Sequence, residues 1–345
     1  MVKSCVGVDI GNARIKMVEI RRKGRGLQVV KLGEVVTPDS AVRRGKVLSE
    51  DVLATTLRSL KQELGISSDY VVVGITSQDI VVKQTKFPTM GAKDLAQVLE
   101  FELKDILRLS FNALDEVAYS YEEFARTEEE VEVLVTGCQR SLINPYISAL
   151  TQAGLAPSVI DIHAFALPRV LKDVEKPCLV DIGANQTSIY SESNGVFSAY
   201  RILPIGGDQI TEGVMEAFEI GKLKAEEYKK EKTLDSLLQD GTGPKGLIRT
   251  TVQQLVDGIM QTLDFIRAKE RGSSVNEVID TVFISGGTVS IQGLLEIIST
   301  ESEIPTERLD PFAEITFTDQ SMVPEDPWTF ASAVGLALRG LQDED

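Results

Sequence analysis

The alternation of apolar and polar positions near the start of the chain predicts a meander of three strands. A short apolar run over residues 6–8 leads into an Asp-Ile-Gly turn at residues 9–11, and strand-like alternation follows over residues 14–20 and 27–36. The polar segment 21–26 between these two runs is rich in Arg and Gly, which is typical of a hairpin turn. A buried strand, a glycine turn and a hairpin are therefore expected in this order.

The same order of elements returns about half the chain later. A second Asp-Ile-Gly turn occupies residues 181–183, and strand-like segments follow over residues 187–191 and 196–203. Between these segments lies Asn194-Gly195, the strongest short-range signal for a β-hairpin. The two copies predict a duplicated fold whose halves face each other.

Helix-like and strand-like segments alternate after each meander, as in α/β proteins. The first half continues with an amphipathic segment 51–64 and an apolar run 70–75, which predict a helix and a buried strand. The second half continues with one buried strand and three helices, predicted over residues 281–285, 208–218, 247–270 and 290–300.

Residues 77–140 have no counterpart in the second half and predict an inserted subdomain. Three strands and one helix are expected within it, over residues 81–87, 118–124, 131–138 and 93–109. A helix over 141–153 and a strand over 159–162 then return the chain to the first half. The expected organisation is a first domain of residues 1–76 and 141–175, the inserted subdomain 77–140, and a second domain of residues 176–345.

Composition and charge narrow the class of protein without changing this architecture. The 345 residues are 43% hydrophobic and the mean hydropathy is zero, as in soluble globular proteins. The formal net charge of −16 disfavours binding to nucleic acid. No apolar run approaches the roughly 20 residues of a membrane helix, and the first residues lack a signal-peptide core. We therefore expect a cytoplasmic protein without direct membrane insertion.

Histidine and cysteine are too few or too far apart for several kinds of site. His163 is the only histidine, which excludes a metal site with several histidines and allows a Ser-His-Asp triad only once. Cys5, Cys138 and Cys178 lie far apart in apolar stretches and form no CxxC pair. Buried free thiols in a reducing compartment are expected.

Four glycine turns at strand ends carry the candidate chemistry. Glycine at position 11 or 183 lets backbone amides approach a phosphate without a Cβ in the way. Two further turns, at residues 205–208 and 284–288, each follow a strand and open a helix whose N-terminus has unpaired donors. Together, the four turns predict one nucleotide cleft.

Each Asp-Ile-Gly turn begins with a carboxylate. Asp9 and Asp181 suit a hydrated Mg²⁺ ion, which prefers oxygen ligands and often bridges phosphates through its waters. The alternative is that each aspartate only caps its own turn. The metal role is favoured because both copies keep Asp at the same place.

On these turns the sequence resembles the actin-like ATPase superfamily, in which two ribonuclease H-like domains flank a nucleotide cleft. Residues 9–16 resemble the first phosphate motif, residues 181–189 the second and residues 284–288 the adenosine motif. Residues 201–212 and 225–229 are similar to the phosphate turn and the ribose-binding helix of the FtsA and PilM branch. The resemblance implies an α/β fold of duplicated actin-like domains with an FtsA-like inserted subdomain.

The same resemblance implies ATP and Mg²⁺ as ligands. Asp9 and Asp181 would hold the ion, in part through water. The residues implied around the nucleotide are Asp9, Gly11, Asn12, Ala13, Lys16, Gly183, Ala184, Asn185, Gln186, Gly206, Gly207, Glu226, Lys229, Gly286, Gly287 and Thr288.

Within this branch the chain is most similar to the PilM family of type IV pilus assembly, through residues 87–102, 153–166, 310–312 and 333–339. This resemblance implies an ATP-binding scaffold that docks on the cytoplasmic N-terminal peptide of PilN, an inner-membrane protein, and through it on the pilus assembly complex. FtsA ends in an amphipathic membrane helix, whereas this chain ends in the acidic segment 341–345. Association with the inner face of the membrane is therefore expected through the partner.

Two departures from active relatives predict slow or absent ATP hydrolysis. The second turn reads Gly-Ala-Asn-Gln-Thr over residues 183–187, where active relatives carry Gly-Gly-Gly-Thr-Thr. Asp161 stands where MreB carries the Glu of a Glu-Pro pair, and its side chain is one methylene shorter. Asp161 and Asp181 are the candidate catalytic residues, and His163 is interpreted as a packed side chain rather than a base.

Two other functions stay open, namely a filament-forming ATPase like FtsA, with self-association, and a small-molecule kinase of the same superfamily. The kinase would need a substrate pocket and a cleft carboxylate, for which only Asp161 presents itself. Charged segments at residues 21–25 and 222–232 are interpreted as a solvated turn and a surface helix. Residues 234–246 are expected to form a linker, because their Gly-Thr-Gly-Pro-Lys run lacks the Walker spacing.

Overall fold

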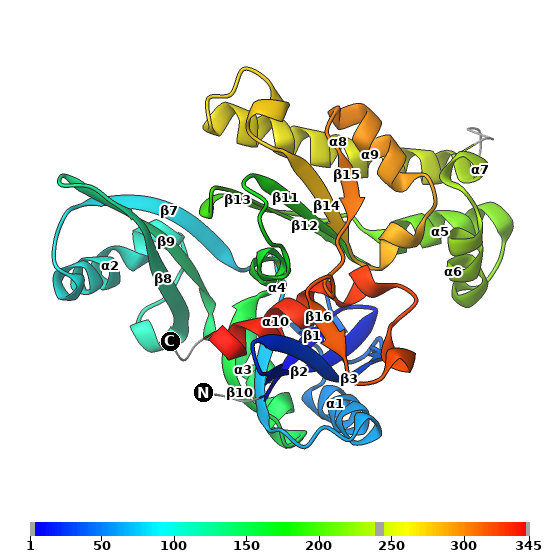
Figure 1. The fold of residues 1–345 in the computed structure, drawn as a ribbon, viewed down its shortest axis with the longest axis horizontal. Helices are drawn as coiled ribbons and strands as arrows, with labels where there is room; N and C mark the ends of the chain where they lie inside the picture. The colour runs from blue at the N-terminus through cyan, green and yellow to red at the C-terminus, as the bar shows by residue number, and fades with distance from the viewer. Residues whose placement is uncertain (1–3, 239–244, 343–345) are drawn as a thin grey trace.

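The fold was obtained as a computed structural model, which describes residues 4–238 and 245–342 and contains two large sheets with their helices (Figure 1). The strands are β1 (Ser4–Ile10), β2 (Arg14–Lys23), β3 (Gly26–Val36), β4 (Val42–Arg43), β5 (Lys46–Val47), β6 (Tyr70–Ile75), β7 (Val81–Pro88), β8 (Val117–Arg126), β9 (Glu130–Gln139), β10 (Ala156–Ile162), β11 (Pro177–Ile182), β12 (Thr187–Ser193), β13 (Val196–Leu203), β14 (Thr281–Ser285), β15 (Thr306–Arg308) and β16 (Ile315–Phe317). The helices are α1 (Glu50–Leu64), α2 (Ala92–Leu107), α3 (Arg140–Gln152), α4 (His163–Ala166), α5 (Gly207–Phe218), α6 (Lys222–Glu231), α7 (Leu234–Leu238), α8 (Lys245–Lys269), α9 (Leu294–Ser302) and α10 (Ala331–Gln342).

The two large sheets share one topology, which confirms the predicted duplication. In the first sheet, of order β10-β6-β1-β2-β3-β16, strands β1 to β3 form an antiparallel meander and β6 runs parallel to β1. In the second sheet, of order β13-β12-β11-β14-β15, strands β11 to β13 form the meander and β14 runs parallel to β11. Each Asp-Ile-Gly turn therefore lies at the end of a central strand.

Helix α1 shows how the sequence sets the ends of a helix in this fold. The Ser49 side chain accepts a hydrogen bond from the backbone N–H of Val52, and Gly65 ends the helix in the left-handed conformation, at φ 62°. Leu53 and Leu57 lie on one face of the helix and are buried against the first sheet. The predicted helix over residues 51–64 is confirmed within one residue.

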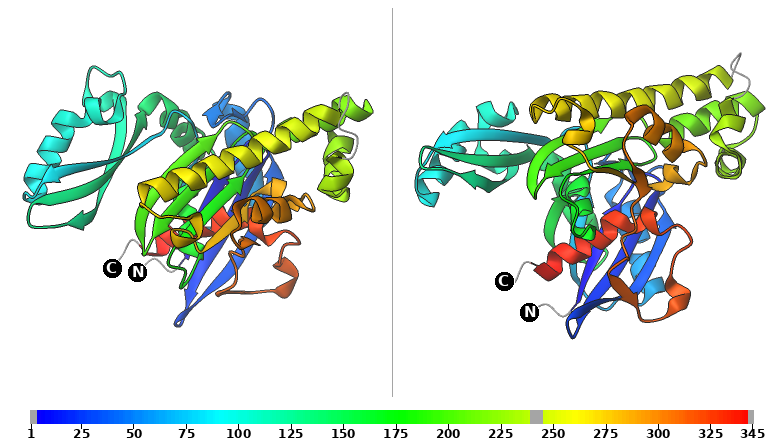
Figure 2. Two further views of the ribbon diagram at one scale, coloured as in Figure 1. Left: turned by 90° about the horizontal axis from the view of Figure 1, so that it is seen from above. Right: turned by 45° about the horizontal axis from the view of Figure 1, so that its top comes forward.

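The inserted segment has its own small sheet and core. Strands β7, β9 and β8 pair antiparallel in this order, and α2 packs against them (Figure 2). Leucines at every fourth position of α2 are buried in this core, namely Leu95, Leu99, Leu103 and Leu107. The helix therefore presents one apolar stripe to the sheet, as its sequence period indicates.

The C-terminal segment differs from the predicted organisation, which groups residues 176–345 in the second half. Strand β16 pairs parallel with β3, and α10 packs against β1, β2 and β6 of the first sheet. The physical reason is the composition of α10, whose side chains are buried along most of its length. A helix apolar on all sides needs cover on all sides, and the first sheet supplies it.

Two boundaries in the second half also differ from the prediction. The helix expected over residues 290–300 begins only at Leu294, because Gly293 before it is left-handed, at φ 94°. Residues 234–246, expected to be a linker, contain α7 and the start of α8, while residues 239–244 lie outside the described part. The buried side chains of Leu234 and Leu237 explain α7.

The three cysteines are free and buried, as predicted. Burial raises the pKa of the Cys138 thiol to about 11 and that of the Cys178 thiol to about 12. Both thiols therefore stay protonated near neutral pH. Across residues 4–238 and 245–342, no helix has both the length and the apolar character needed to cross a membrane.

Candidate functional site

The first Asp-Ile-Gly turn is closed by a hydrogen bond from the backbone N–H of Gly11 to the carbonyl of Arg14, at 3.1 Å. Thr37, which directly follows β3, fixes the turn, because its hydroxyl donates to the Gly11 carbonyl at 2.8 Å. Asp9 is buried, and its carboxylate lies 3.9 Å from the ammonium of Lys16 on β2. The first half thus brings a buried carboxylate and a buried ammonium to the end of β1.

Asn12 and Ala13 lie within this first turn. The carbonyl of Ala13 accepts from the backbone N–H of Thr37, at 3.0 Å. The side-chain oxygen Oδ1 of Asn12 is buried and has no hydrogen-bond partner among the residues that the structure describes. A buried polar atom without a partner is costly, so this oxygen is available to a ligand or to water.

The second Asp-Ile-Gly turn repeats the geometry of the first. The backbone N–H of Gly183 donates to the Gln186 carbonyl at 3.0 Å, which is the same one-to-four closure. The Asp181 carboxylate accepts a hydrogen bond of 2.8 Å from the hydroxyl of Ser285, at the end of β14. The carboxylate of the second turn is therefore oriented by the neighbouring parallel strand.

Two further glycine turns close onto this second turn. The backbone N–H of Gly207 donates to the Gly183 carbonyl at 2.9 Å, and the Thr288 hydroxyl donates to the same carbonyl at 3.1 Å. A Cβ added at Gly206 would lie 2.5 Å from the Gly183 carbonyl oxygen, so a side chain cannot be accommodated there. The turns at residues 183–187, 205–208 and 284–288 therefore form one contiguous surface.

Gly286 and Gly287 have different roles in this surface. Gly286 is left-handed, at φ 94°, and a Cβ there would lie 2.4 Å from the carbonyl of Ile182. Beyond its own stretch of backbone, no atom of the described residues lies within 4 Å of the position that a Cβ would take at Gly287. Glycine at 286 is therefore required for the turn itself, while the space at Gly287 leaves the backbone open to a ligand.

The three residues that depart from the Gly-Gly-Gly-Thr-Thr pattern in the second turn all take part in hydrogen bonds, Asn185 and Gln186 through their side chains and Ala184 through its backbone. Asn185 donates to the Asp208 carboxylate at 2.5 Å. Gln186 is buried and donates to the carbonyl of Thr76 in the first half, at 3.3 Å. Ala184 accepts through its carbonyl from the backbone N–H of Asp208, at 2.8 Å. These residues tie the second turn to α5 and to the first half.

Lys229 on α6 is buried beneath the turn at Gly207. Its ammonium donates to the Gly207 carbonyl at 3.2 Å, to the Thr211 hydroxyl at 2.7 Å and to the Glu226 carboxylate at 2.9 Å. Burial lowers the pKa of Lys229. Burial acts to raise the pKa of Glu226, but Lys229 and Thr211 outweigh it and hold this pKa below its usual range.

His163 lies between the two aspartates, which the sequence analysis did not predict. Its Nε2 is 3.2 Å from the Asp9 carboxylate, and its Nδ1 is 3.8 Å from the Asp181 carboxylate. The hydroxyl of Ser332 on α10 lies 3.4 Å from Nδ1. The interpretation of His163 as a packed residue holds for its burial, but its contacts are ionic and join the two halves.

The charge of His163 follows from these neighbours. Burial favours the neutral ring, but Asp9 and Asp181 raise the pKa of His163 to about 9. Burial likewise acts to raise the pKa of Asp9, yet His163 and Lys16 hold it below its usual range. At neutral pH the ring is therefore a buried imidazolium between two carboxylates. A single histidine in a short apolar segment gives no sequence signal for such a contact.

Asp161, the predicted catalytic residue, is held by arginine. Its carboxylate accepts from Arg169 at 2.8 Å and lies 3.8 Å from Nε of Arg339. It also accepts from the backbone N–H of Ile162, at 2.8 Å. His163, rather than Asp161, is thus the side chain that contacts both Asp9 and Asp181.

The two aspartates fit a hydrated Mg²⁺ ion by the chemistry of their oxygen atoms. Within the described ranges there is no group of three or more His, Cys, Asp or Glu side chains placed to hold a metal. Mg²⁺ usually takes one or two carboxylates and completes its shell with water and phosphate oxygens. Asp9 and Asp181 can supply those carboxylates, and an ion between them would compete with His163 for the same oxygens.

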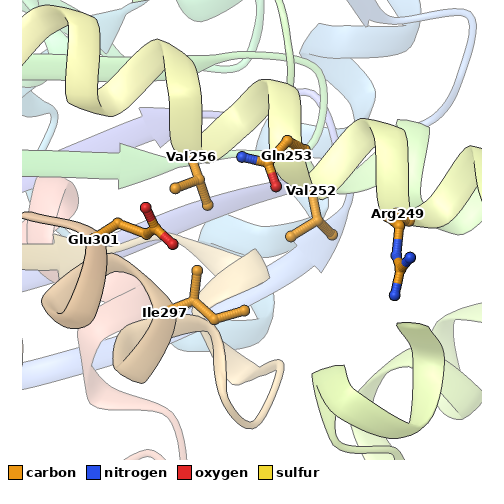
Figure 3. Close-up of a pocket in the computed structure, with 6 residues that line it drawn as sticks. All are labelled: Arg249, Val252, Gln253, Val256, Ile297 and Glu301. Carbon is orange, nitrogen blue, oxygen red and sulfur yellow. The ribbon is translucent and has the colours of Figure 1, made fainter. Parts of the chain in front are cut away.

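A separate cavity of about 340 Å³ lies between α8 and α9 (Figure 3). Val252, Val256 and Ile297 form its apolar part. Arg249, Gln253 and Glu301 add polar groups around it. The predicted nucleotide residues do not line this cavity.

Residues 7–341 match the protein family described as type IV pilus assembly protein PilM. The chain is also similar to the cell division protein FtsA of Pseudomonas aeruginosa, at 24% identity over 99% of this chain and 90% of that protein. FtsA of Bacillus subtilis is 20% identical over 85% of this chain and 75% of that protein.

Solved structures share the fold. A structure of a PilM-PilN type IV pilus biogenesis complex aligns with a TM-score of 0.84 at 23% identity, over 98% of both chains. The ethanolamine utilization protein EutJ of Carboxydothermus hydrogenoformans aligns with a TM-score of 0.57 at 16% identity, over 97% of this chain and 89% of that chain. MreB5 of Spiroplasma citri bound to AMPPNP aligns with a TM-score of 0.52 at 9% identity, over 99% and 97% of the two chains.

The chain aligns over nearly its whole length with these structures and has the two duplicated meanders, so the predicted actin-like fold is confirmed. The family match covers nearly the whole chain, including both Asp-Ile-Gly turns and the inserted subdomain. The chain therefore belongs to the PilM family of type IV pilus assembly proteins.

Proposed function

We propose that the protein binds Mg-ATP between its two halves and serves as a cytoplasmic scaffold that docks on the N-terminal peptide of PilN. The observation that carries the nucleotide part is that three glycine turns of the second half form one surface, and that His163 joins Asp181 beside this surface to Asp9 of the first turn. Open backbone at Gly287 and buried Lys16 supply groups of the kind that phosphates bind.

In this proposal Asp9 and Asp181 hold Mg²⁺, in part through water. The ion supplies positive charge that neutralises the phosphate oxygens. The turns at Gly11, Gly183 and Gly207 would hold the phosphates. Glu226 and Lys229 of α6 hold the sugar side of the nucleotide, as the resemblance implies.

Slow hydrolysis is part of the same proposal. Asp161 is neutralised by Arg169, and the side chains of Asn185 and Gln186 are already engaged by protein groups. A carboxylate held in an ion pair is a poor base for an attacking water. We expect turnover below the roughly 1 s⁻¹ that marks the lower end for ordinary phosphoryl-transfer enzymes. Faster release of phosphate in a coupled assay would contradict this expectation.

The PilN part of the proposal is supported by the family and by the fold shared with a PilM-PilN complex. The inserted subdomain, with its own core, is the place proposed for the peptide. Docking on a bitopic protein would hold the chain at the inner face of the membrane.

A calorimetric titration tests both parts. The purified protein is titrated with Mg-ATP, with a synthetic peptide copied from the N-terminus of PilN of the same organism, and with each in the presence of the other. Binding of both supports the proposal. If ATP binds and the peptide does not, the result supports a nucleotide-binding actin-like protein and contradicts the docking on PilN. The FtsA relatives make filament formation the second candidate, and ATP-dependent sedimentation would support it.

The variant Asp9→Asn is expected to weaken Mg-ATP binding at least about tenfold, which corresponds to about 1.4 kcal/mol. The carboxylate proposed as a magnesium ligand is lost while the shape of the side chain is kept. Asp264→Asn on α8 is the matched control, because Asp264 is exposed and its carboxylate pairs with Arg267 on its own helix. Calorimetry with and without EDTA is the measurement. An equal loss in both variants, or the same affinity in the absence of Mg²⁺, would contradict the metal role.

A further inference from the structure

The inserted subdomain contacts the second half where the edges of two sheets approach each other. Strand β7 is the edge of the inserted sheet and β13 is the edge of the second sheet. The side-chain amide of Gln84 on β7 donates to the carbonyl of Phe197 on β13, at 2.9 Å. The two strands lie close together in Figure 1. This contact fixes the position of the inserted sheet relative to the second sheet, although the two sheets are not joined by backbone pairing.

Lys269, at the end of α8, fastens this contact. Its ammonium donates to the Gln84 side-chain oxygen and to the backbone carbonyl of Ser198. It also lies 5.7 Å from the centre of the Phe197 ring, within cation–π range. The next residue, Glu270, accepts from the Ser198 hydroxyl at 2.6 Å. One lysine thus joins α8, β13 and β7.

Phe197 also belongs to an aromatic cluster at the boundary between the halves. Its ring centre lies 5.7 Å from that of Phe165, which is also 5.2 Å from Tyr190 and 5.5 Å from Tyr200. Phe165 is part of α4, the short helix that begins at His163. Close packing of this kind transmits displacements of one element to the next.

An unbroken series of contacts therefore leads from the two aspartates to the inserted sheet. It runs from His163 through α4 to Phe165, from Phe165 to Phe197, and from Phe197 to Gln84 and Lys269. A ligand that separates Asp9 and Asp181 from His163 would act on the first member of this series. At the other end of the series, Gln84 lies in the subdomain proposed to hold the peptide.

We propose that Lys269 is a positioning residue that couples the nucleotide cleft to the inserted subdomain. This inference rests on the proposed function and adds a means of regulation to it. Lys269 makes β7 follow any movement of β13, so that occupancy of the cleft changes the placement of the peptide site. Without the lysine, the bond from the Gln84 amide to Phe197 stays, but the link from α8 to β7 is lost, so β7 follows β13 less closely. Coupling between two sites requires a structural element whose position depends on the occupancy of both, and the junction of β7 and β13 is such an element.

The test measures peptide affinity by calorimetry with and without Mg-ATP, in the wild type, Lys269→Met and Lys269→Arg. The wild type is expected to show at least about a fivefold change in peptide Kd upon addition of Mg-ATP. Lys269→Met is expected to reduce this change to less than about twofold, while each ligand alone binds with wild-type affinity. Lys269→Arg keeps the charge and the donors, and most of the coupling is expected to remain.

The matched control is Lys172→Met, because Lys172 is an exposed lysine whose ion pair with Glu314 lies outside this junction. Hydrogen exchange of residues 81–88 gives a second measure, in which Mg-ATP should change protection in the wild type but not in Lys269→Met. Full coupling in Lys269→Met overturns the inference, as does a wild type that binds both ligands independently. A wild type that binds neither ligand overturns the proposed function together with the inference.

Discussion

Raising the pH from 6.5 to 9 is expected to lower the free energy of unfolding of the metal-free protein by up to about 3 kcal/mol, through His163. The carboxylates of Asp9 and Asp181 raise the pKa of this ring to about 9, whereas the unfolded chain has the ordinary value of 6.5. Between these two values the native protein binds the proton and the unfolded chain does not. The stabilisation is therefore complete below pH 6.5 and is lost as the pH rises through 9.

Urea unfolding in EDTA at pH 6.0, 7.5 and 8.5 measures this dependence, and the variant His163→Gln is its control. Because His163 is the only histidine, few other side chains change charge in this range. The variant is expected to be less stable than the wild type at pH 6.0 and nearly as stable at the highest pH. Parallel pH profiles for the two proteins would show that the ring is not a buried cation.

The glycine turns could be predicted from the sequence because each is a local signal at a strand end. Gly11 and Gly183 follow apolar runs, and the hairpins behind them carry turn residues of their own. The same local logic predicts the helix over residues 93–109, which the structure shows as α2. These predictions hold because strand pairing and helix faces depend on residues close together in the chain.

His163 and Lys269 could not be found in this way because their partners are distant in the sequence. Asp9 and Asp181 meet the imidazole only after both halves have folded and α4 has been placed between them. From the sequence, Lys269 is predicted to be a polar residue at the end of an amphipathic helix. Its contact with Gln84 is visible only in the structure. Contacts between residues that lie far apart in the sequence leave no spacing pattern from which they could be predicted.

The C-terminal helix was assigned to the wrong half for a related reason. Its composition predicts burial but does not say which sheet covers it. Close approach of the backbones selects the first sheet. A Cβ at Gly7 on β1 would lie 1.9 Å from the carbonyl of Ala333, so α10 can pack here only because residue 7 is glycine. A glycine in the middle of a central strand is a weak signal of close approach, which the sequence analysis did not use.

Gly335→Ala in α10 is expected to lower the free energy of unfolding by about 3 kcal/mol or more. Helix propensity alone predicts the opposite, a gain of about 1 kcal/mol, because alanine favours helix more than glycine does. The steric effect decides, since the new Cβ would lie 2.0 Å from the backbone carbonyl of Ala166. Neither atom belongs to a flexible side chain, so α10 and α4 must separate to relieve the overlap.

Urea unfolding at pH 6.0 measures this loss, with Gly26→Ala as the control, since the nearest atom to its Cβ lies 3.8 Å away. The control should stay within about 0.5 kcal/mol of the wild type. The Ser332 hydroxyl of α10 lies 3.4 Å from the His163 ring, so separating the helices also disturbs the ring between the aspartates. Gly335→Ala should therefore show a weaker dependence of stability on pH than the wild type. A stabilised variant would mean that helix propensity outweighs the contact, and that α10 does not hold α4 in place.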